Sequence, residues 1–235
     1  MTGLYPHAHG MCCNVEDLGC SMHELIDRPS LLSRRLQEEG YRCGYTGKWH
    51  LGSDRDMFYG VENQPTLPKD VGFEGQQFPG HGNGGFKYPE YQQYLAEHGW
   101  EHRVLPKNDD KPYHAWNYGL LESPVESTVP CFLADHTISM IDRFAASGEP
   151  FFIWHNFWGP HGPYYVPRDF YELYRDVEIP EWPNFRWQST NMNRPHLAKV
   201  HTHAAKLTWS EWAEAVRYYY AFASLIDRQI GRILD

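Results

Sequence analysis

Apolar and polar positions follow the same order in two separate segments of the chain. In residues 29–50, a proline and a serine open a leucine-rich stretch with helical spacing. That stretch breaks at Gly40 and gives way to an extended run from Tyr41 to Thr46. Proline and serine are common at helix starts, and glycine commonly ends a helix. We therefore predict a helix followed by a strand.

The second segment, residues 133–163, repeats this order. An apolar stripe at helical spacing ends at Gly148 and Pro150, and the run from Phe151 to Phe157 is typical of a short buried strand. Because helix and strand alternate, the sequence predicts an α/β fold with a largely parallel or mixed central sheet flanked by helices.

Two stretches lack this periodicity. Residues 53–130 are rich in Gly, Pro, Asn and aromatic residues, and residues 164–208 form a second irregular excursion before a last amphipathic helix over residues 211–235. Long irregular insertions in a compact domain are usually functional or face a partner. We expect these stretches to supply pocket walls or plain surface cover within one domain, residues 1–235.

Composition narrows the class of protein. The 235 residues are 41% hydrophobic and 16% aromatic, enough for one sizeable core and an argument against disorder. No apolar run approaches the roughly eighteen residues of a membrane-spanning helix. We therefore expect no membrane as partner. The formal net charge is -9 without any basic block, so we expect no nucleic acid as partner.

Cysteine usage and the first residues leave the compartment open. The five cysteines are odd in number and form no Cys-x-x-Cys pair, which indicates neither a disulfide framework nor a zinc site. The first residues lack the basic and apolar regions of a signal peptide. Localisation and oligomeric state are therefore unknown from the sequence.

Candidate chemistry gathers where the two predicted strands end. Lys48 and His50 follow the first strand, and His161 follows the second, between two Gly-Pro turns. In open α/β sheets, ligands bind outside the carboxyl ends of the strands. If the backbone is still extended, Lys48 and His50 share one face. Lysine and histidine side chains in such a cluster suit a tetrahedral oxyanion. A lone Lys-x-His sequence is weak evidence for an active site. The matching position of His161 after the second strand strengthens this evidence.

Histidine pairs elsewhere give no metal site. His7 and His9, like His201 and His203, have a spacing that can place two imidazoles on one metal, but neither pair has a third ligand nearby in sequence. We interpret both pairs as solvated loops and assign no metal ligand. His9 is the one that we expect to help shape its own turn.

Four sequence blocks, in this order, together resemble one family. They are "TGLYPHAHGM", "GYRCGYTGKWHLG", "EPFFIWHNFWGPHGPYYVP" and "YYYAFASLIDRQIGRIL". They resemble the sulfatase family of the alkaline phosphatase superfamily. The resemblance implies hydrolysis of sulfate esters through a formylglycine made from Cys or Ser, with a divalent ion, usually calcium, opposing the sulfate charge.

The resemblance also implies roles for the three candidate residues. Lys48 matches the lysine that contacts the formylglycine and a sulfate oxygen. His50 matches the histidine that hydrogen-bonds the formylglycine hydroxyl, and His161 matches the histidine beside the leaving oxygen, a candidate general acid. Each position would neutralise charge that builds up in the transition state, which agrees with the chemistry of these side chains.

The chain departs from the family pattern in its nucleophile and metal ligands. No cysteine stands in a Cys-x-Pro-Ser-Arg context, so we expect the formylglycine upstream of Met1. The metal ligands are expected before Met1 and after Asp235. Residues 1–235 are accordingly predicted to be a partial sulfatase catalytic domain that does not turn over substrate alone.

Two alternatives stay open beside a sulfatase acting on a sulfated glycan or a small aryl sulfate. The first is a phosphonate or phosphate monoester hydrolase of the same superfamily, because tetrahedral oxyanions look alike to lysine and histidine. The second is a non-catalytic remnant that binds an anion or a glycan. Fold-level analogy says little about substrate.

Overall fold

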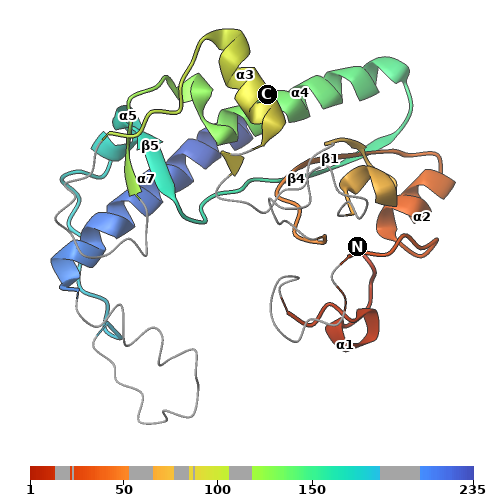
Figure 1. The fold of residues 1–235 in the computed structure, drawn as a ribbon, viewed down its shortest axis with the longest axis horizontal. Coiled ribbons are helices and arrows are strands. Elements are labelled where there is room, and N and C mark those ends of the chain that lie inside the picture. Colours follow the sequence, from red (N-terminus) through yellow and green to blue (C-terminus); the bar gives the residue numbers. More distant parts are fainter. Residues whose placement is uncertain are drawn as a thin grey trace. The chain divides into compact units, whose positions relative to one another are not determined.

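The computed structural model describes most of the chain (Figure 1). The chain divides into two compact units that interleave along the sequence. The described residues are 1–13, 22, 24–52, 66–76, 85–86, 88–105, 118–185 and 207–235. The first unit comprises Met1–Glu101, Val125–Trp158 and Gln229–Asp235, and the second comprises His102–Pro124 and Gly159–Arg228. The prediction of one domain over residues 1–235 stays a prediction.

A parallel sheet forms the centre of the first unit. Its strand order is β2 (Glu74–Gly75), β1 (Arg42–Gly47) and β4 (Phe151–Asn156). Strand β1 pairs with β4 along its whole length, from Arg42 opposite Phe151 to Gly47 opposite Asn156. The predicted α/β fold with parallel strands is confirmed, and each predicted strand lies within one residue of its observed bounds.

Helices precede both long strands, as predicted. Helix α2 (Leu32–Glu38) leads into β1, and helix α4 (Val129–Ser147) leads into β4. The Thr128 hydroxyl caps α4 by accepting a hydrogen bond from the backbone N–H of Cys131. Gly148 ends the same helix with a φ of 72°, a left-handed conformation that glycine adopts without strain.

The two helices contact opposite faces of β1. Side chains alternate along a strand, so Cys43 and Tyr45 point into a buried cluster with Leu31 of the α2 segment. Gly44 faces α4 instead, where an added Cβ would lie 2.1 Å from the sulfur of Met140. Glycine at this position therefore permits the close approach of α4 to the sheet.

The stretch 53–130 is more ordered than expected where the structure describes it. It contains η1 (Pro68–Val71), α3 (Pro89–His98), β3 (Tyr118–Leu121), η3 (Val125–Ser127) and the start of α4. Helix α3 buries Tyr91 and Leu95, four residues apart on one face. The expectation of an irregular stretch is wrong for these elements, because η1, α3, β3 and η3 are each too short to leave a clear apolar repeat in the sequence.

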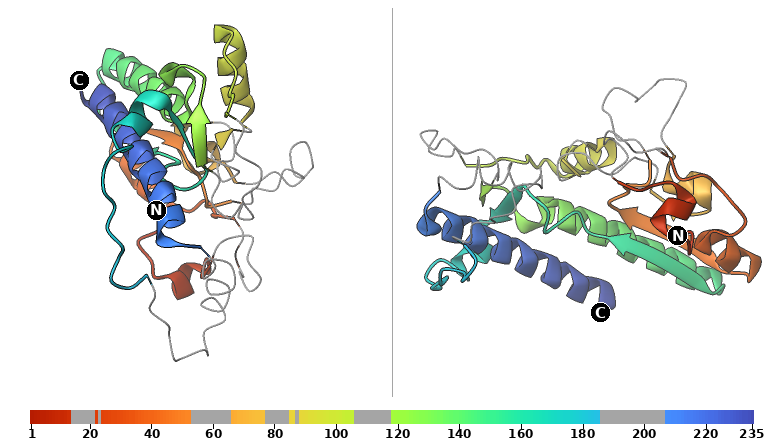
Figure 2. Two further views of the ribbon diagram at one scale, coloured as in Figure 1. Left: turned by 90° about the vertical axis from the view of Figure 1, so that its left-hand side faces the viewer. Right: turned by 90° about the horizontal axis from the view of Figure 1, so that it is seen from below.

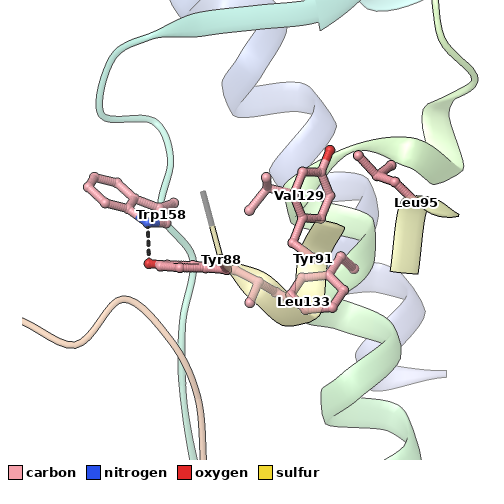
Figure 3. Close-up of a cluster of buried hydrophobic side chains, with 7 residues drawn as sticks. Tyr88, Tyr91, Leu95, Val129, Leu133 and Trp158 are labelled. Carbon is pink, nitrogen blue, oxygen red and sulfur yellow. Dashed lines mark hydrogen bonds between the residues drawn. The ribbon is translucent and has the colours of Figure 1, made fainter. Parts of the chain in front are cut away.

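Helix α3 packs against α4 in a compact aromatic cluster (Figure 3). Its buried members are Tyr88, Tyr91, Leu95, Val129, Phe132, Leu133 and Trp158. Within it, the indole N–H of Trp158 donates a 2.6 Å hydrogen bond to the hydroxyl of Tyr88. The cluster thus includes Trp158, which lies in the loop directly after β4.

In the second unit, β3 pairs in parallel with β5 (Tyr164–Pro167), and α5 (Arg168–Glu172) follows directly. The excursion predicted over residues 164–208 therefore begins with a regular strand and a short helix. The last helix, α7 (Trp209–Leu234), runs without interruption from the second unit into the C-terminal segment of the first, and it confirms the predicted amphipathic helix (Figure 2). None of the helices in the described ranges is both long and apolar enough to cross a membrane.

Candidate active site

The end of β1 is built around a glycine. Gly47 has a φ of 103°, and an added Cβ would lie 1.6 Å from the carbonyl oxygen of Asn156. The Gly47 N–H donates to the side-chain carbonyl of Gln76, and the next N–H, that of Lys48, donates to the Asn156 carbonyl at 3.0 Å. This close pairing places Lys48 at the carboxyl edge of the parallel sheet, where ligands bind in open α/β folds.

Side chains then fix the backbone of Lys48. The hydroxyl of Tyr45 donates to the Lys48 carbonyl, and the side-chain amide of Asn156 donates to the Tyr45 hydroxyl at 2.6 Å and to the Lys48 carbonyl at 3.3 Å. The Asn156 side-chain oxygen in turn accepts from the indole N–H of Trp154 at 3.1 Å. Burial raises the pKa of Tyr45 well above its usual range, which keeps its hydroxyl a donor.

Trp49 separates the two candidate residues and turns them to the same side. Its side chain is 1% exposed, and its indole N–H donates to the Thr66 carbonyl at 2.7 Å. Because Trp49 points into the core, Lys48 and His50 both point away from it and line one pocket. This is the shared face that their spacing predicts.

The pocket has a volume of about 570 Å³ and lies within the first unit. Its lining combines basic and polar groups with apolar walls: Met1, Thr2, Gly3, Leu4, His9, Met11, Leu25, Tyr45, Lys48, His50, Leu51, Trp154, Asn156 and Phe157. Among the residues that the structure describes, no carboxylate lines this pocket. A pocket with an ammonium, imidazoles and amide or hydroxyl donors favours an anion.

Lys48 is the principal charge of this pocket. Its side chain is half-buried, and burial lowers its pKa. The ammonium nitrogen lies 4.4 Å from the centroid of the Trp158 ring, within the range of a cation–π interaction. Lys48 therefore enters the pocket with its backbone held by Tyr45 and Asn156 and its side chain held against an aromatic face.

His9 lines the same pocket from the short helix α1 (Pro6–His9). Its Nδ1 accepts a 3.1 Å hydrogen bond from the backbone N–H of Met11. The neutral ring therefore carries its proton on Nε2. The bond to Met11 agrees with the expectation that His9 shapes its own turn, and its place in the pocket was not predicted.

His161 belongs to the second unit, in the loop between β4 and β5. Its ring is exposed, and Nδ1 donates to the Gly162 carbonyl at 2.7 Å. The peptide bonds before Pro160 and Pro163 are both cis. The structure thus brings Lys48 and His50 together in one pocket, and the part of His161 in the site stays a prediction.

The described residues do not form the metal site or supply the nucleophile that the sulfatase family uses. In the ranges that the structure describes, no three His, Cys, Asp or Glu side chains gather closely enough to hold a metal ion. Cys12 and Cys13 are exposed and Cys43 and Cys131 are buried, and none of these four lines the pocket. Cys20, His201 and His203 lie outside the described residues. Within the described ranges, the chain therefore supplies neither a calcium site nor a cysteine for formylglycine beside Lys48.

Sequence reasoning missed three residues that support Lys48. Tyr45 and Asn156 were expected only as members of the two strands, and Trp158 was given no role in the site, although each contacts the backbone or the ammonium of Lys48. Asn156 lies 108 residues from Lys48 along the chain. The one local signal is that Asn156 is a polar residue at the very end of an apolar strand, where functional groups of α/β folds gather.

Comparison with known proteins decides the family. The family model described as Sulfatase matches residues 1–235, the whole chain. This chain belongs to the sulfatase family. A curated sulfatase relative is "Uncharacterized sulfatase YidJ" of Escherichia coli (strain K12), with 22% identity over 256 residues, covering 100% of this chain and 42% of that protein. The chain thus spans less than half the length of this relative.

Solved structures share the fold of this sulfatase family member. A phosphonate monoester hydrolase of Agrobacterium radiobacter gives a TM-score of 0.64 at 21% identity, over 99% of this chain and 47% of that one. BT4656, solved in complex with its substrate D-glucosamine-2-N,6-O-disulfate, gives a TM-score of 0.50 at 13% identity, over 99% of this chain and 50% of that one. At these identities the likeness concerns the fold alone.

Proposed function

We propose that the whole protein hydrolyses sulfate esters and that Lys48 and His50 receive the sulfate group. The observation that carries this proposal is their common pocket at the carboxyl edge of β1 and β4, whose described lining residues include hydrogen-bond donors and no carboxylate. Membership of the sulfatase family supports the same reaction class. The residue roles rest on the family resemblance together with this geometry.

Lys48 acts in this scheme by charge. A sulfate ester builds up negative charge on its oxygens and on the leaving oxygen as the bond breaks. A preorganised ammonium stabilises that charge better than water does, because it does not have to reorient during the reaction. The contacts of Tyr45, Asn156 and Trp158 with Lys48 supply this preorganisation.

His50 and His161 act by proton transfer and hydrogen bonding. Imidazoles exchange protons near neutral pH, which suits a group that must donate in one step and accept in another. His50 lines the pocket beside Lys48. We propose His161 as the acid for the leaving oxygen, on the family resemblance alone.

Calcium and formylglycine complete the proposal for the whole protein. In the sulfatase family they supply the counter-charge for the sulfate and the attacking hydroxyl. The described residues supply neither group. We therefore propose that the isolated 235-residue chain binds an anion weakly and does not turn over substrate.

We propose a sulfated glycan or a small aryl sulfate as the substrate. The aromatic side chains Trp154 and Phe157 in the pocket wall can stack on a sugar or an aryl ring. BT4656, which shares the fold, has a sulfated glucosamine as its substrate. A phosphonate or phosphate monoester is the second candidate, because its tetrahedral anion presents the same charge to Lys48.

The test measures binding and turnover separately. Calorimetric titration of the chain with inorganic sulfate and with a sulfated glucosamine should show binding that Lys48→Met abolishes and Lys69→Met, on the exposed surface of η1, preserves. In the whole protein, Lys48→Met should lower kcat/KM for an aryl sulfate by at least roughly a hundredfold. Equal activity of wild type and Lys48→Met contradicts the proposal. A higher kcat/KM for a phosphonate monoester than for any sulfate ester favours the second candidate.

A further inference from the structure

Lys48 has an unusual neighbour for a half-buried ammonium. Its nitrogen lies 4.4 Å from the centroid of the Trp158 ring. Trp158 is 4% exposed and belongs to the aromatic cluster between α3 and α4. The indole N–H of Trp158 donates a hydrogen bond to the Tyr88 hydroxyl at 2.6 Å (Figure 3). The ring that faces the ammonium is therefore itself held in place.

Burial alone would work against a charged lysine. Removing an ammonium from water disfavours its charged form, and burial is what lowers the pKa of Lys48. In the described part of the chain, no carboxylate forms an ion pair with it. The negative face of an indole ring offsets part of this loss without adding a negative charge that would repel a substrate anion.

The Trp158 ring has little freedom to move. Tyr88, Val129 and Leu133 belong to the same buried cluster. An added Cβ at Gly85 would lie 3.0 Å from its Cδ1. The hydrogen bond to Tyr88 fixes the rotation of the ring about its own axis. A rigid ring sets the place of the ammonium more sharply than a flexible surface contact would.

We propose that Trp158 is a positioning residue for Lys48, whose indole face holds the ammonium in the pocket in its charged form, with the Tyr88 hydroxyl fixing the orientation of the ring. The consequence for catalysis rests on the proposed function, because it assumes that Lys48 receives the sulfate. The contact itself does not depend on that assumption.

The decisive test changes the ring face and leaves its shape almost unaltered. Trp158 alone is replaced by tryptophans that carry an increasing number of ring fluorines, which withdraw electron density from the face and weaken its attraction for a cation. The readout is the pKa of Lys48, taken from the pH titration of its 15Nζ NMR signal and assigned with Lys48→Arg. We expect this pKa to fall stepwise, by about one unit with a fully fluorinated benzene ring.

Matched variants separate positioning from a merely structural role. The same fluorinated residue at Trp209, whose indole N–H donates to the Ile179 carbonyl in the second unit, should leave the Lys48 signal unchanged. Trp158→Phe keeps an aromatic face and should retain most of the Lys48 pKa, whereas Trp158→Leu should lower it. Tyr88→Phe should give a smaller fall, because the ring keeps its face and loses its fixed orientation.

The outcomes distinguish this proposal from the proposed function. A Lys48 pKa that stays constant along the fluorine series overturns the positioning role of Trp158. The same result does not bear on the proposed sulfatase function, because no substrate is present in the titration. Conversely, a stepwise fall supports the positioning role even if the whole protein prefers phosphonate esters. A Tyr88→Phe variant with the wild-type Lys48 pKa overturns the orienting part assigned to Tyr88.

Discussion

The side-chain amide of Asn156 donates a 2.6 Å hydrogen bond to the hydroxyl of Tyr45, a residue 111 positions earlier in the chain. The pair joins the carboxyl ends of β4 and β1, and the Tyr45 hydroxyl passes the connection on to the Lys48 carbonyl. Lys48 is therefore held in place by two strands at once. The geometry of the pocket depends on a long-range contact as much as on the local Lys-x-His sequence.

This network predicts energetic coupling between its members. Tyr45→Phe and Asn156→Ala should each lower the free energy of unfolding by about 1–2 kcal/mol, because each leaves a partly buried polar group without its partner. The double variant should lose less than the sum, with a coupling of about 1 kcal/mol. Urea denaturation of the four proteins measures this. Additive losses would show that the hydrogen bond contributes nothing of its own.

The backbone at Gly47 predicts a much larger effect. Gly47→Ala combines a positive φ with a Cβ that would lie 1.6 Å from the Asn156 carbonyl oxygen, so the ends of β1 and β4 must separate. We expect a loss of at least about 3 kcal/mol. Gly148→Ala is the matched control, since its φ of 72° is also positive but nothing lies within 4 Å of an added Cβ.

The control variant should lose only the cost of a left-handed residue, about 1 kcal/mol. Thermal melting of both variants under one buffer condition gives the comparison. Similar losses at the two glycines would mean that the tight pairing of β1 with β4 at Gly47 does not limit stability. The close approach to Asn156 would then have no energetic consequence.

His155 predicts a loss of stability in mild acid. Burial lowers its pKa from 6.5 to about 4, and Thr137 contacts its Nδ1 at 2.7 Å. The unfolded state therefore binds more protons than the folded state between these two values. The contribution of His155 is fully present above pH 6.5 and is lost as the pH falls toward 4, by on the order of 3 kcal/mol.

Melting temperatures between pH 7.5 and 4, at about half-unit steps, measure this slope. His155→Asn keeps a polar partner for Thr137 and removes the titrating ring, so its stability should depend less on pH in this window. His102 and His136 also have pKa values lowered by burial, so part of the slope remains in the variant. A variant with the full wild-type slope would exclude His155 as a source of acid sensitivity.

Periodicity in the sequence is enough to predict the frame of the fold. The helix before each strand and the apolar run of β4 follow from the apolar pattern, and the alternation of helix and strand predicts the parallel pairing of β1 with β4. Helix α3 escaped prediction, since tyrosines and charged residues share its short length. The first strand was predicted to end at Thr46, whereas the pairing with Asn156 extends β1 to Gly47.

The candidate site was predictable only in its local part. Residues two apart on an extended chain share a face, which is why Lys48 and His50 were expected together. Asn156, Tyr45 and Trp158 reach Lys48 through tertiary contacts, and no spacing rule connects residues so far apart in sequence. His9 lines the pocket because of the way the N-terminal segment folds. The His-x-His spacing alone does not predict this position.

The lowered pKa of Lys48 predicts how anion binding depends on pH. Burial shifts this pKa below that of an ordinary lysine, so the ammonium loses its proton at a lower pH than exposed lysines do. Affinity for inorganic sulfate should therefore decrease as pH rises through that lowered value, while exposed lysines are still charged. Lys48→Arg keeps the charge throughout this range, because guanidinium groups do not deprotonate there.

Calorimetric titrations of both proteins across the alkaline range should show a pH-dependent affinity for wild type and a nearly constant one for Lys48→Arg. The same decline in both proteins would mean that the titration of another group determines the affinity for sulfate. That outcome would contradict the assignment of Lys48 as the sulfate-binding residue.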